Sequence, residues 1–532
     1  MKGLKISSRQ IFVVLVFVAI FPAFSAQAEK VTVGSNVIDP AQYPSISDKE
    51  MGQMRWMLNI ANQPLNDFKG LEAQNQANLT SYRYAIAFSA YFLALEQYHK
   101  LPAWSEAIQP ALDRLVQKII QKPVWEYWAQ TSRGVPPLEP GLNKPYPEAH
   151  DPVAEKNIMY SGHVGHMINL YEMLYRDFKW DKPGSIVFAW SDTEKFVYDN
   201  HTLEKVMYDQ MKNNSYHSIC CEPNAVFPEC NQHPVLSFIL YDYTHGTKLS
   251  EVNSQYMDFF LKKKMVDPNS HQTAMLYLVK QDLTLSQSNP HYGSAIDILF
   301  TPAIALHLAT LDSPTANGWT GTFMHGWQPD YIERLYPEWK KQQVIEKDKE
   351  TAELKNESWE PLVRYGFFAM LAGEMGDMDT RDKLLNYADK KFAPVWQDGT
   401  YHYPYNPGKG CTNFSDKLFA FARANPRNGL WLLHNKPFDK AHFAEPKLAG
   451  VDFPNVLVKR AIYDANKKAL VVSIEPGSKK GGNTSFEVRQ LDPFRSYVYF
   501  VDGKEIGKYQ GQATIVLKPA LDNPHDLVLA AE

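Results

Sequence analysis

The spacing of apolar residues constrains the fold of this 532-residue chain most strongly. Over most of the segment 48–435 they recur at intervals of three and four residues, which places them on one face of a helix. One such series is Tyr84, Phe88, Tyr91 and Leu95. Stretches rich in Pro and Gly, such as 134–146, interrupt the pattern repeatedly. We therefore expect antiparallel helical hairpins of unequal sequence, a pattern that fits a closed α/α toroid as well as a helical bundle.

The pattern changes after about Pro437 to short runs rich in β-branched and aromatic residues. Asp502-Gly503, between alternating residues, predicts a tight hairpin. We expect strands at 469–474, 486–489, 497–501 and 513–517. The chain is thus predicted to contain a signal peptide at 1–28, a helical domain at 29–436 and a small β-rich domain at 437–532. A structural role for the last domain is favoured over sugar binding.

The N-terminal 28 residues have the pattern of a secretory signal peptide. Basic residues come first, followed by the apolar run 11–24 and by Ala26-Gln27-Ala28. Cleavage there would leave Glu29 as the first residue. The run is short for a membrane span, so an uncleaved anchor is the less favoured interpretation. We expect a soluble protein in a periplasm or outside a cell.

Charge and motifs narrow the classes of partner. A formal net charge of -4 gives no general attraction to polyanions, so we expect no nucleic-acid partner. The sequence lacks a Gly-x-Ser-x-Gly motif, a P-loop and a dinucleotide-binding fingerprint in a suitable context. We therefore expect no nucleotide cofactor. The aromatic content of 13% indicates a large aromatic core or an aromatic-lined pocket.

Two segments carry side chains that exchange protons near neutral pH. One contains Cys221, Glu222 and Cys230, and the other contains Met159 and His163. Thiols, a carboxylate and an imidazole can together perform acid–base or covalent chemistry without a cofactor. The alternatives are a disulfide or inert buried thiols, a surface or capping carboxylate, and core packing of the methionine and the histidine.

Local sequence shapes both segments. Pro223 and Pro228 predict that the thiols lie on a constrained loop. His163 directly follows Gly162, and we expect both in a helix that begins near Lys156. Because glycine lowers helix stability by about 1 kcal/mol relative to alanine, its presence predicts close approach of another segment there.

The four cysteines allow several pairings in an oxidising compartment. Cys220 and Cys221 are adjacent and rarely pair with each other. The candidate bridges join Cys220 or Cys221 to Cys230, and a remaining cysteine to Cys411. The sequence alone does not decide between them.

A metal site is a competing interpretation of the same region. The available nitrogen and sulfur ligands are Cys221, Cys230, His163, His166 and His233. Their spacing matches neither a zinc knuckle nor a His-Glu-x-x-His motif. We therefore predict no metal at these residues.

The two chemical segments resemble motifs of the linalool dehydratase/isomerase family. The likeness also includes 83–88, 241–247 and 374–377, and it extends with gaps over residues 50–435. It implies an (α,α)6 toroid that assembles as a homo-oligomer and needs no cofactor. It also implies dehydration of a tertiary allylic terpene alcohol to a diene and isomerisation to a primary alcohol.

The resemblance implies a role for each matching residue. Cys221 and Cys230 would be the paired catalytic thiols, His163 the acid–base partner, and Glu222 the neighbouring catalytic carboxylate. The residues that would line the substrate pocket are Tyr84, Met159 and Phe227. The sequence departs from the family pattern where an aspartate is expected near 59–62, and where a tyrosine is expected near Ile296.

Asp297 lies beside the missing tyrosine, inside an apolar run, and is a further substrate-binding candidate. A carboxylate buried there without a partner would have a raised pKa, although helix ends and buried ion pairs produce the same pattern. With these departures, we predict a cofactor-independent dehydratase/isomerase for an apolar alcohol or alkene, terpenoid or polyketide-like.

Two other functions fit parts of the sequence. A carbohydrate-active enzyme on the same helical fold would need two carboxylates, for which Asp297, Asp192 and Glu126 are available without diagnostic spacing. A non-catalytic binding protein would have Cys221 and Cys230 joined in a disulfide.

Overall fold

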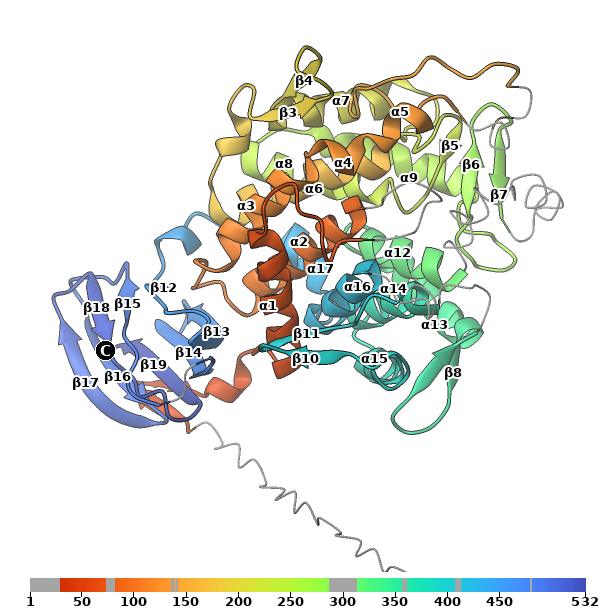
Figure 1. Ribbon diagram of the computed structural model, residues 1–532. Coiled ribbons are helices and arrows are strands. Elements are labelled where there is room, and N and C mark those ends of the chain that lie inside the picture. The colour runs from red at the N-terminus through yellow and green to blue at the C-terminus, as the bar shows by residue number, and fades with distance from the viewer. Residues whose placement is uncertain are drawn as a thin grey trace, which may run out of the picture.

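Among the described residues, helices predominate up to Asn435 and strands predominate after it. The structure is a computed structural model that describes residues 29–72, 82–134, 139, 142–286, 313–355, 361–406, 413–478 and 481–532 (Figure 1). The predicted signal peptide, Asp297 and Cys411 lie outside the described residues. Among the described helices, none combines the length and the apolar character needed to cross a membrane.

One set of helices forms a ring. Along the chain each of these helices packs on the next, and the last packs on the first. Almost all of their described side chains are buried, so hydrophobic residues surround each helix instead of forming one stripe. The set comprises α2 (Tyr82–His99), α6 (Ile158–Tyr175), α8 (Gln232–His245), α12 (Ser313–His325), α14 (Pro361–Glu374) and α16 (Asn413–Ala424).

A second set of helices packs outside this ring and has exposed and buried faces. In α3, Ile108, Leu112, Leu115 and Ile119 are buried while polar residues between them face outward. The set comprises α1 (Asp48–Asn62), α3 (Ile108–Ile119), α7 (Asn200–Asn213), α9 (Val252–Lys262), α13 (Pro329–Gln343) and α15 (Met378–Phe392). Shorter helices are α4 (Lys122–Trp125), α5 (Tyr127–Thr131) and α17 (Gly429–Asn435). The protein is therefore mainly helical, as predicted.

Small antiparallel sheets connect some of the helices. They are β3 (Ile186–Ala189) with β4 (Lys195–Tyr198), β5 (Ala225–Val226) with β6 (Leu276–Leu278) and β7 (Leu283–Leu285), β8 (Val344–Glu346) with β9 (Ala352–Leu354), and β10 (Val395–Gln397) with β11 (Thr400–His402). One-turn 3-10 helices in the described part of the chain lie at 40–42, 179–181, 249–251 and 442–444.

The C-terminal strands form two antiparallel sheets beside the helices (Figure 1). The five-stranded sheet has the order β13 (Val456–Asp464), β14 (Ala469–Pro476), β19 (His525–Ala531), β16 (Ser496–Val501) and β17 (Lys504–Gln510). The three-stranded sheet has the order β12 (Lys447–Ala449), β15 (Phe486–Arg489) and β18 (Thr514–Leu517). The four predicted strands are confirmed, and Asp502 and Gly503 both have the positive φ that a tight two-residue hairpin requires.

The C-terminal sheets are joined to the rest of the chain by backbone contacts. The Ala461 N–H donates to the Lys100 carbonyl, and the Ala103 N–H donates to the Ala461 carbonyl, each at 2.9 Å. The N-terminal hairpin of β1 (Val31–Val33) and β2 (Asn36–Ile38) packs in one apolar cluster with β14, β16 and β19. The predicted domain boundary at 436/437 stays a prediction.

The α6–α8 contact positions the predicted chemistry. An added Cβ at Gly162 would lie 3.0 Å from Pro234 Cδ and 3.3 Å from His233 Cβ. Gly162 thus meets the close approach that its helical position predicts. The helix begins at Ile158, two residues after the predicted start, because Lys156 and Asn157 have φ of 61° and 58°, outside the helical region.

We predict that Gly318→Ala in α12 destabilises the fold by about 1–3 kcal/mol, despite the higher helix propensity of alanine. A Cβ there would lie 2.5 Å from the backbone carbonyl carbon of Phe367 in α14, which cannot rotate away. Urea unfolding followed by circular dichroism measures the effect. Gly507→Ala is the control, since its Cβ meets no heavy atom within 4 Å. Equal stability of the Gly318 variant and the wild type would contradict the packing argument.

Candidate active site

The loop that carries the two predicted thiols begins with a tight turn. The Ala225 N–H donates to the Glu222 carbonyl at 3.0 Å, and the Cys221 N–H donates to the Ala225 carbonyl at 2.9 Å. Pro223 occupies the second position of this turn, and Asn224 has φ of 73° at the third. Proline followed by a residue with positive φ is the signature of a type II turn. The sequence therefore determines the local geometry next to Cys221.

Asn231 closes the other end of the loop. Its side-chain oxygen accepts from the Ile219 N–H at 2.8 Å, and its side-chain nitrogen donates to the carbonyls of Ile219 and Phe227 at 3.0 Å each. These bonds hold the segments before Cys221 and Cys230 together. The two thiols hydrogen-bond to each other as a result.

The described cysteines of this loop are free thiols and form no disulfide. Cys220, Cys221 and Cys230 are all free and buried. The bridge to Cys230 that the sequence allowed is thus not present among the described residues. Any pairing with Cys411 lies outside them.

A buried cation lies next to the thiols. The Arg83 guanidinium carbon is 4.4 Å from the ring centre of Tyr84 and 4.2 Å from that of Tyr127. The Tyr84 hydroxyl donates to Met159 Sδ at 3.1 Å, and Arg83 Nη2 lies 3.5 Å from the same sulfur. Two predicted pocket residues, Tyr84 and Met159, therefore lie together against Arg83.

Burial keeps both thiols protonated at neutral pH. It raises the pKa of the Cys230 thiol to about 11, and it raises the pKa of Cys221 well above its ordinary value. Two interactions oppose this for Cys230, because the Cys221 thiol donates to its sulfur and Arg83 attracts its thiolate form. Cys230 is the member of the pair that deprotonates more readily.

Glu229 is a site residue that the sequence analysis missed. Its carboxyl group is buried, and burial, reinforced by repulsion from Glu222, raises its pKa to about 8. Glu229 is protonated at neutral pH and influences the pKa of both Cys221 and Cys230. Its position directly before Cys230 was the available signal, but adjacency in a loop does not reveal burial.

His163 is fixed by a tyrosine. The Tyr91 hydroxyl lies 2.7 Å from His163 Nδ1, while Nε2 is buried and has no hydrogen-bond partner among the described residues. Burial lowers the pKa of His163 well below its usual range, so the imidazole is neutral. The bond to Nδ1 indicates that a tyrosine hydroxyl orients the His163 ring.

Behind His163, a chain of buried histidines crosses the core. His233 Nδ1 lies 3.4 Å from both Tyr91 Oη and His166 Nδ1, and His166 Nε2 lies 2.8 Å from His434 Nε2. His434 Nδ1 faces the Leu430 carbonyl at 2.8 Å, and the indole N–H of Trp319 donates to His233 Nε2 at 3.2 Å. This chain of histidines ends at the Leu430 carbonyl, which can only accept a hydrogen bond, and at the Trp319 indole N–H, which can only donate one.

These two ends assign the tautomers of the whole chain. His434 must donate from Nδ1, so its Nε2 accepts from His166 Nε2–H, which leaves His166 Nδ1 as an acceptor. His233 accepts at Nε2 and therefore carries its proton on Nδ1. The Tyr91 hydroxyl then donates to His163 Nδ1. His163 consequently presents an N–H group at Nε2.

The remaining predicted residues have different placements. The Tyr84 ring packs edge-on against His163 with centroids 5.8 Å apart, and its phenol lies within electrostatic range of Cys221 and Cys230, so Tyr84 links the imidazole and the thiols. Phe227 is buried and its carbonyl holds Asn231. Asp297 lies outside the described residues.

A comparison with models of protein families matches residues 83–310 and 291–408 to linalool dehydratase/isomerase. These ranges span more than half of the chain and include Arg83, His163 and the two thiols. The chain belongs to the linalool dehydratase/isomerase family. The resemblance predicted from the two motifs is confirmed, and family membership supports a dehydratase/isomerase activity.

The solved structures that resemble this chain share little sequence identity with it. An α-amylase from Clostridium perfringens is 7% identical, with a TM-score of 0.38 over 72% of this chain and 98% of its own. An α-1,6-mannanase of Salegentibacter sp. HEL1_6 is 11% identical, with a TM-score of 0.39 over 71% of this chain and 99% of its own. These similarities are too low to carry an argument about this chain.

Two of the residues proposed for carbohydrate chemistry lie at the surface of the protein. Glu126 and Asp192 are both exposed. Among the described residues, the three with ligand atoms close enough for a metal ion are Asp181, His201 and His245. None of these three residues is among the five cysteines and histidines that the sequence offered as metal ligands.

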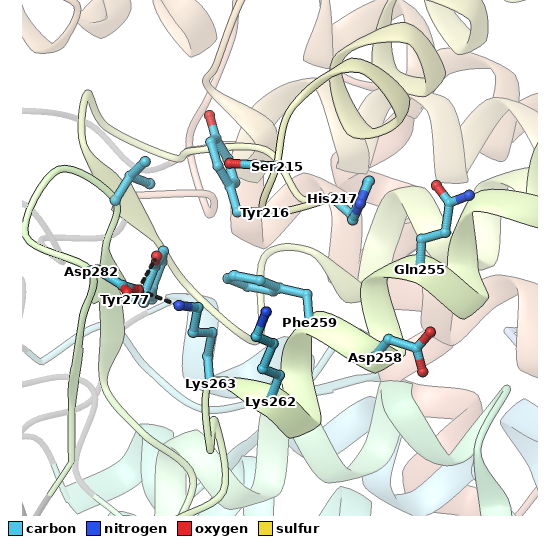
Figure 2. A pocket seen from close by; sticks show the side chains of 11 residues that line it. Ser215, Tyr216, His217, Gln255, Asp258, Phe259, Lys262, Lys263, Tyr277 and Asp282 are labelled. Carbon is cyan, nitrogen blue, oxygen red and sulfur yellow. Dashed lines mark hydrogen bonds and ion pairs between the residues drawn. The ribbon is translucent and has the colours of Figure 1, made fainter.

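A surface pocket of about 530 Å³ lies next to the thiol loop. Figure 2 shows that Tyr216, Phe259 and Tyr277 line this pocket together with charged residues such as Lys263 and Asp282. The Cys220 thiol lies 3.7 Å from the Tyr216 hydroxyl, so Cys220 contacts the pocket lining. Neither Cys221 nor Cys230 lines it, and the candidate active site is separate from this pocket.

The pKa of Glu229 generates a prediction about stability. The folded protein retains a proton there up to about pH 8, whereas an unfolded chain loses it near the ordinary pKa of 4.5. Stability contributed by this proton therefore falls as the pH rises through that window. Glu229→Gln should reduce the loss of stability between pH 5.5 and 7.5 by about 3 kcal/mol, measured by urea unfolding. The exposed Glu126→Gln should follow the wild type, and identical curves for Glu229→Gln would refute the assignment.

Proposed function

We propose that this family member is a cofactor-independent dehydratase/isomerase, a hydro-lyase that acts on an apolar, terpenoid allylic alcohol through Cys221, Cys230 and His163. One observation carries the proposal, namely a hydrogen-bonded pair of buried thiols beside the buried guanidinium of Arg83. Neutral thiols in a dry site can exchange protons with an apolar substrate, and the adjacent cation stabilises the thiolate formed on the way.

Cys230 is the proposed proton carrier. Cys221 donates a hydrogen bond to the sulfur of Cys230, and Arg83 favours the charged form of Cys230. Both interactions strengthen as negative charge develops on that sulfur, which is when stabilisation accelerates a reaction. Cys221 is accordingly the supporting thiol.

The proposed dehydration balances with one thiol. The S–H bond of Cys230 breaks and its proton goes to the substrate hydroxyl, so that water leaves with the electron pair of the C–O bond. The Cys230 thiolate then removes a proton from the adjacent carbon, and the C–H electrons form the new double bond. The thiol is restored without solvent. For isomerisation, the thiolate bonds to the allylic carbon. Water then attacks the other end of the allyl unit, the C–S bond breaks with its electron pair on sulfur, and the released thiolate takes the proton that the water loses.

Arg83 favours this route over a free carbocation. A buried guanidinium beside the reacting carbon raises the energy of an allylic cation through repulsion in a medium of low dielectric constant. The same charge stabilises a thiolate. We therefore propose that positive charge on carbon is offset by sulfur throughout the reaction.

His163 is proposed to hold the hydroxyl group. With Tyr91 donating to Nδ1, His163 presents its Nε2–H to the substrate oxygen, and this hydrogen bond would place the C–O bond toward the thiols. Glu229, protonated at neutral pH, is a second source of a proton next to Cys230. Glu222 remains a proposed catalytic carboxylate.

The surroundings suit an apolar substrate. The side chains that pack around His163 include Tyr84, Phe88 and Trp319, all buried. Aromatic walls exclude water and leave few groups able to bind a sugar hydroxyl. This favours a terpenoid alcohol over the carbohydrate alternative.

The closed cycle of six inner helices and the six outer helices among the described residues support an (α,α)6 toroid as the proposed architecture. The predicted homo-oligomer and the absence of a cofactor stay predictions.

We predict that Cys230→Ala lowers kcat for dehydration of a tertiary allylic terpene alcohol by at least about 1,000-fold, because the proton carrier is lost. Headspace gas chromatography of the diene measures this. His163→Ala should also abolish turnover with little change in folding. Cys220→Ala is the matched control, and it should keep wild-type activity. Turnover retained by Cys230→Ala would overturn the role of the thiol.

We also propose that the protein is exported. The basic start, the apolar run and Ala26-Gln27-Ala28 predict cleavage before Glu29. N-terminal sequencing of protein from a bacterial periplasmic fraction should begin at Glu29. Recovery of the uncleaved chain in the membrane fraction would favour an anchor instead.

A further inference from the structure

Four ionisable side chains converge at the far ends of α6 and α8, away from His163 and His233. Glu172 comes from the last turns of α6, and His245 is the last residue of α8. Asp181 ends the one-turn helix 179–181, and His201 lies in the first turn of α7. Four segments thus meet at one point, between the inner ring and the outer helices.

The distances between their polar atoms are those of a coordination site. His245 Nε2 lies 2.9 Å from Asp181 Oδ2 and 3.6 Å from Glu172 Oε2, and His201 Nε2 lies 3.8 Å from Asp181 Oδ1. Ligand atoms from Asp181, His201 and His245 all lie within 4.8 Å of one another. A tetrahedral ion with bonds of about 2.0–2.1 Å separates its ligand atoms by roughly 3.4 Å, which lies between the shortest and the longest of these three distances.

Both imidazoles are oriented with Nε2 toward this point. His245 Nδ1 lies 3.1 Å from the backbone carbonyl of Tyr241, which can only accept, so Nδ1 carries the proton and Nε2 of a neutral ring has a lone pair. His201 Nδ1 bonds to the Tyr241 hydroxyl at 2.7 Å. Histidine ligands of metals are typically held by the other ring nitrogen in this way.

Two carboxyl groups and two imidazole nitrogens are concentrated at this point. His245 Nε2 and Asp181 Oδ2 are both acceptors when the ring is neutral, and Glu172 adds a second carboxylate that is fully buried. Asn200 Nδ2 donates to Glu172 Oε2 at 2.9 Å and to Asp181 Oδ1 at 3.3 Å. Glu172 Oε1 is buried and has no hydrogen-bond partner among the described residues.

We propose that Asp181, His201 and His245 bind a zinc ion, with Glu172 as the fourth ligand or the acceptor of a bound water. Two imidazoles with carboxylate oxygens suit zinc, whereas calcium and magnesium prefer oxygen ligands alone. The side chain of His201 is 48% exposed, so the ion has a path from solvent. The ion links α6, α7 and α8, and its role is structural, separate from the proposed chemistry of the thiols.

Zinc binding is tested on the purified full-length protein after treatment with EDTA. Isothermal titration calorimetry with ZnCl₂ should show one binding site. The midpoint temperature of unfolding should rise by several degrees with ZnCl₂ but not with MgCl₂. His201→Ala and Asp181→Asn should each weaken the affinity at least ten-fold and remove the thermal shift. His201 is half-exposed, so its variant is expected to fold, which circular dichroism verifies.

Two controls locate the ion. His217→Gln changes a half-buried histidine outside the cluster, and it should bind zinc as the wild type does. Cys230→Ala separates this site from the thiols, and it should also bind normally. The proposal is overturned if the wild type binds no zinc. It is equally overturned if His201→Ala keeps full affinity, or if Cys230→Ala loses it.

Discussion

The packing of α6 against α8 is the contact on which the rest of the site depends. A Cβ at Gly162 would press on Pro234 and His233, and one at Gly165 would lie 3.1 Å from Ser237 Oγ in α8. With hydrogen at both positions the helices approach closely enough for His163 and His233 rings to lie 3.9 Å apart. The same pair of helices holds Glu172 and His245 at its other end. One close helix contact therefore organises two polar clusters in an apolar interior.

Buried polar groups near this contact are satisfied in two different ways. The histidines form a hydrogen-bonded chain in which each ring is neutral, because burial lowers the pKa values of His163, His166 and His233. Around the thiols a permanent charge is present instead, because Arg83 is held between two tyrosine rings. A neutral chain fixes which atom of His163 carries a proton. A buried cation makes one thiol easier to deprotonate than the other.

Much of the fold was predictable because it follows from local patterns. Strands such as β15 and β16 lie within one residue of their predicted ranges, since alternation and turn residues act over a few positions. The geometry of the thiol loop also depends on adjacent residues, because Pro223 and Asn224 suffice for its turn. Contacts between distant segments were not predictable. Tyr91 was read as one member of an apolar helical face, and its hydroxyl bond to His163, 72 positions along the chain, leaves no trace in that pattern.

The sequence by itself determined the helical hairpins, the C-terminal strands, the family, and the residues Cys221, Cys230 and His163 as candidates. Only the tertiary structure decided what surrounds them: the Tyr91 hydroxyl on His163, Arg83 near Cys230, and the buried acid Glu229 beside the thiols. The physical reason is that helical and strand periodicity identifies which side chains are buried. The pKa and the hydrogen-bond role of a buried group depend on partners brought close by packing, and periodicity carries no information about those partners.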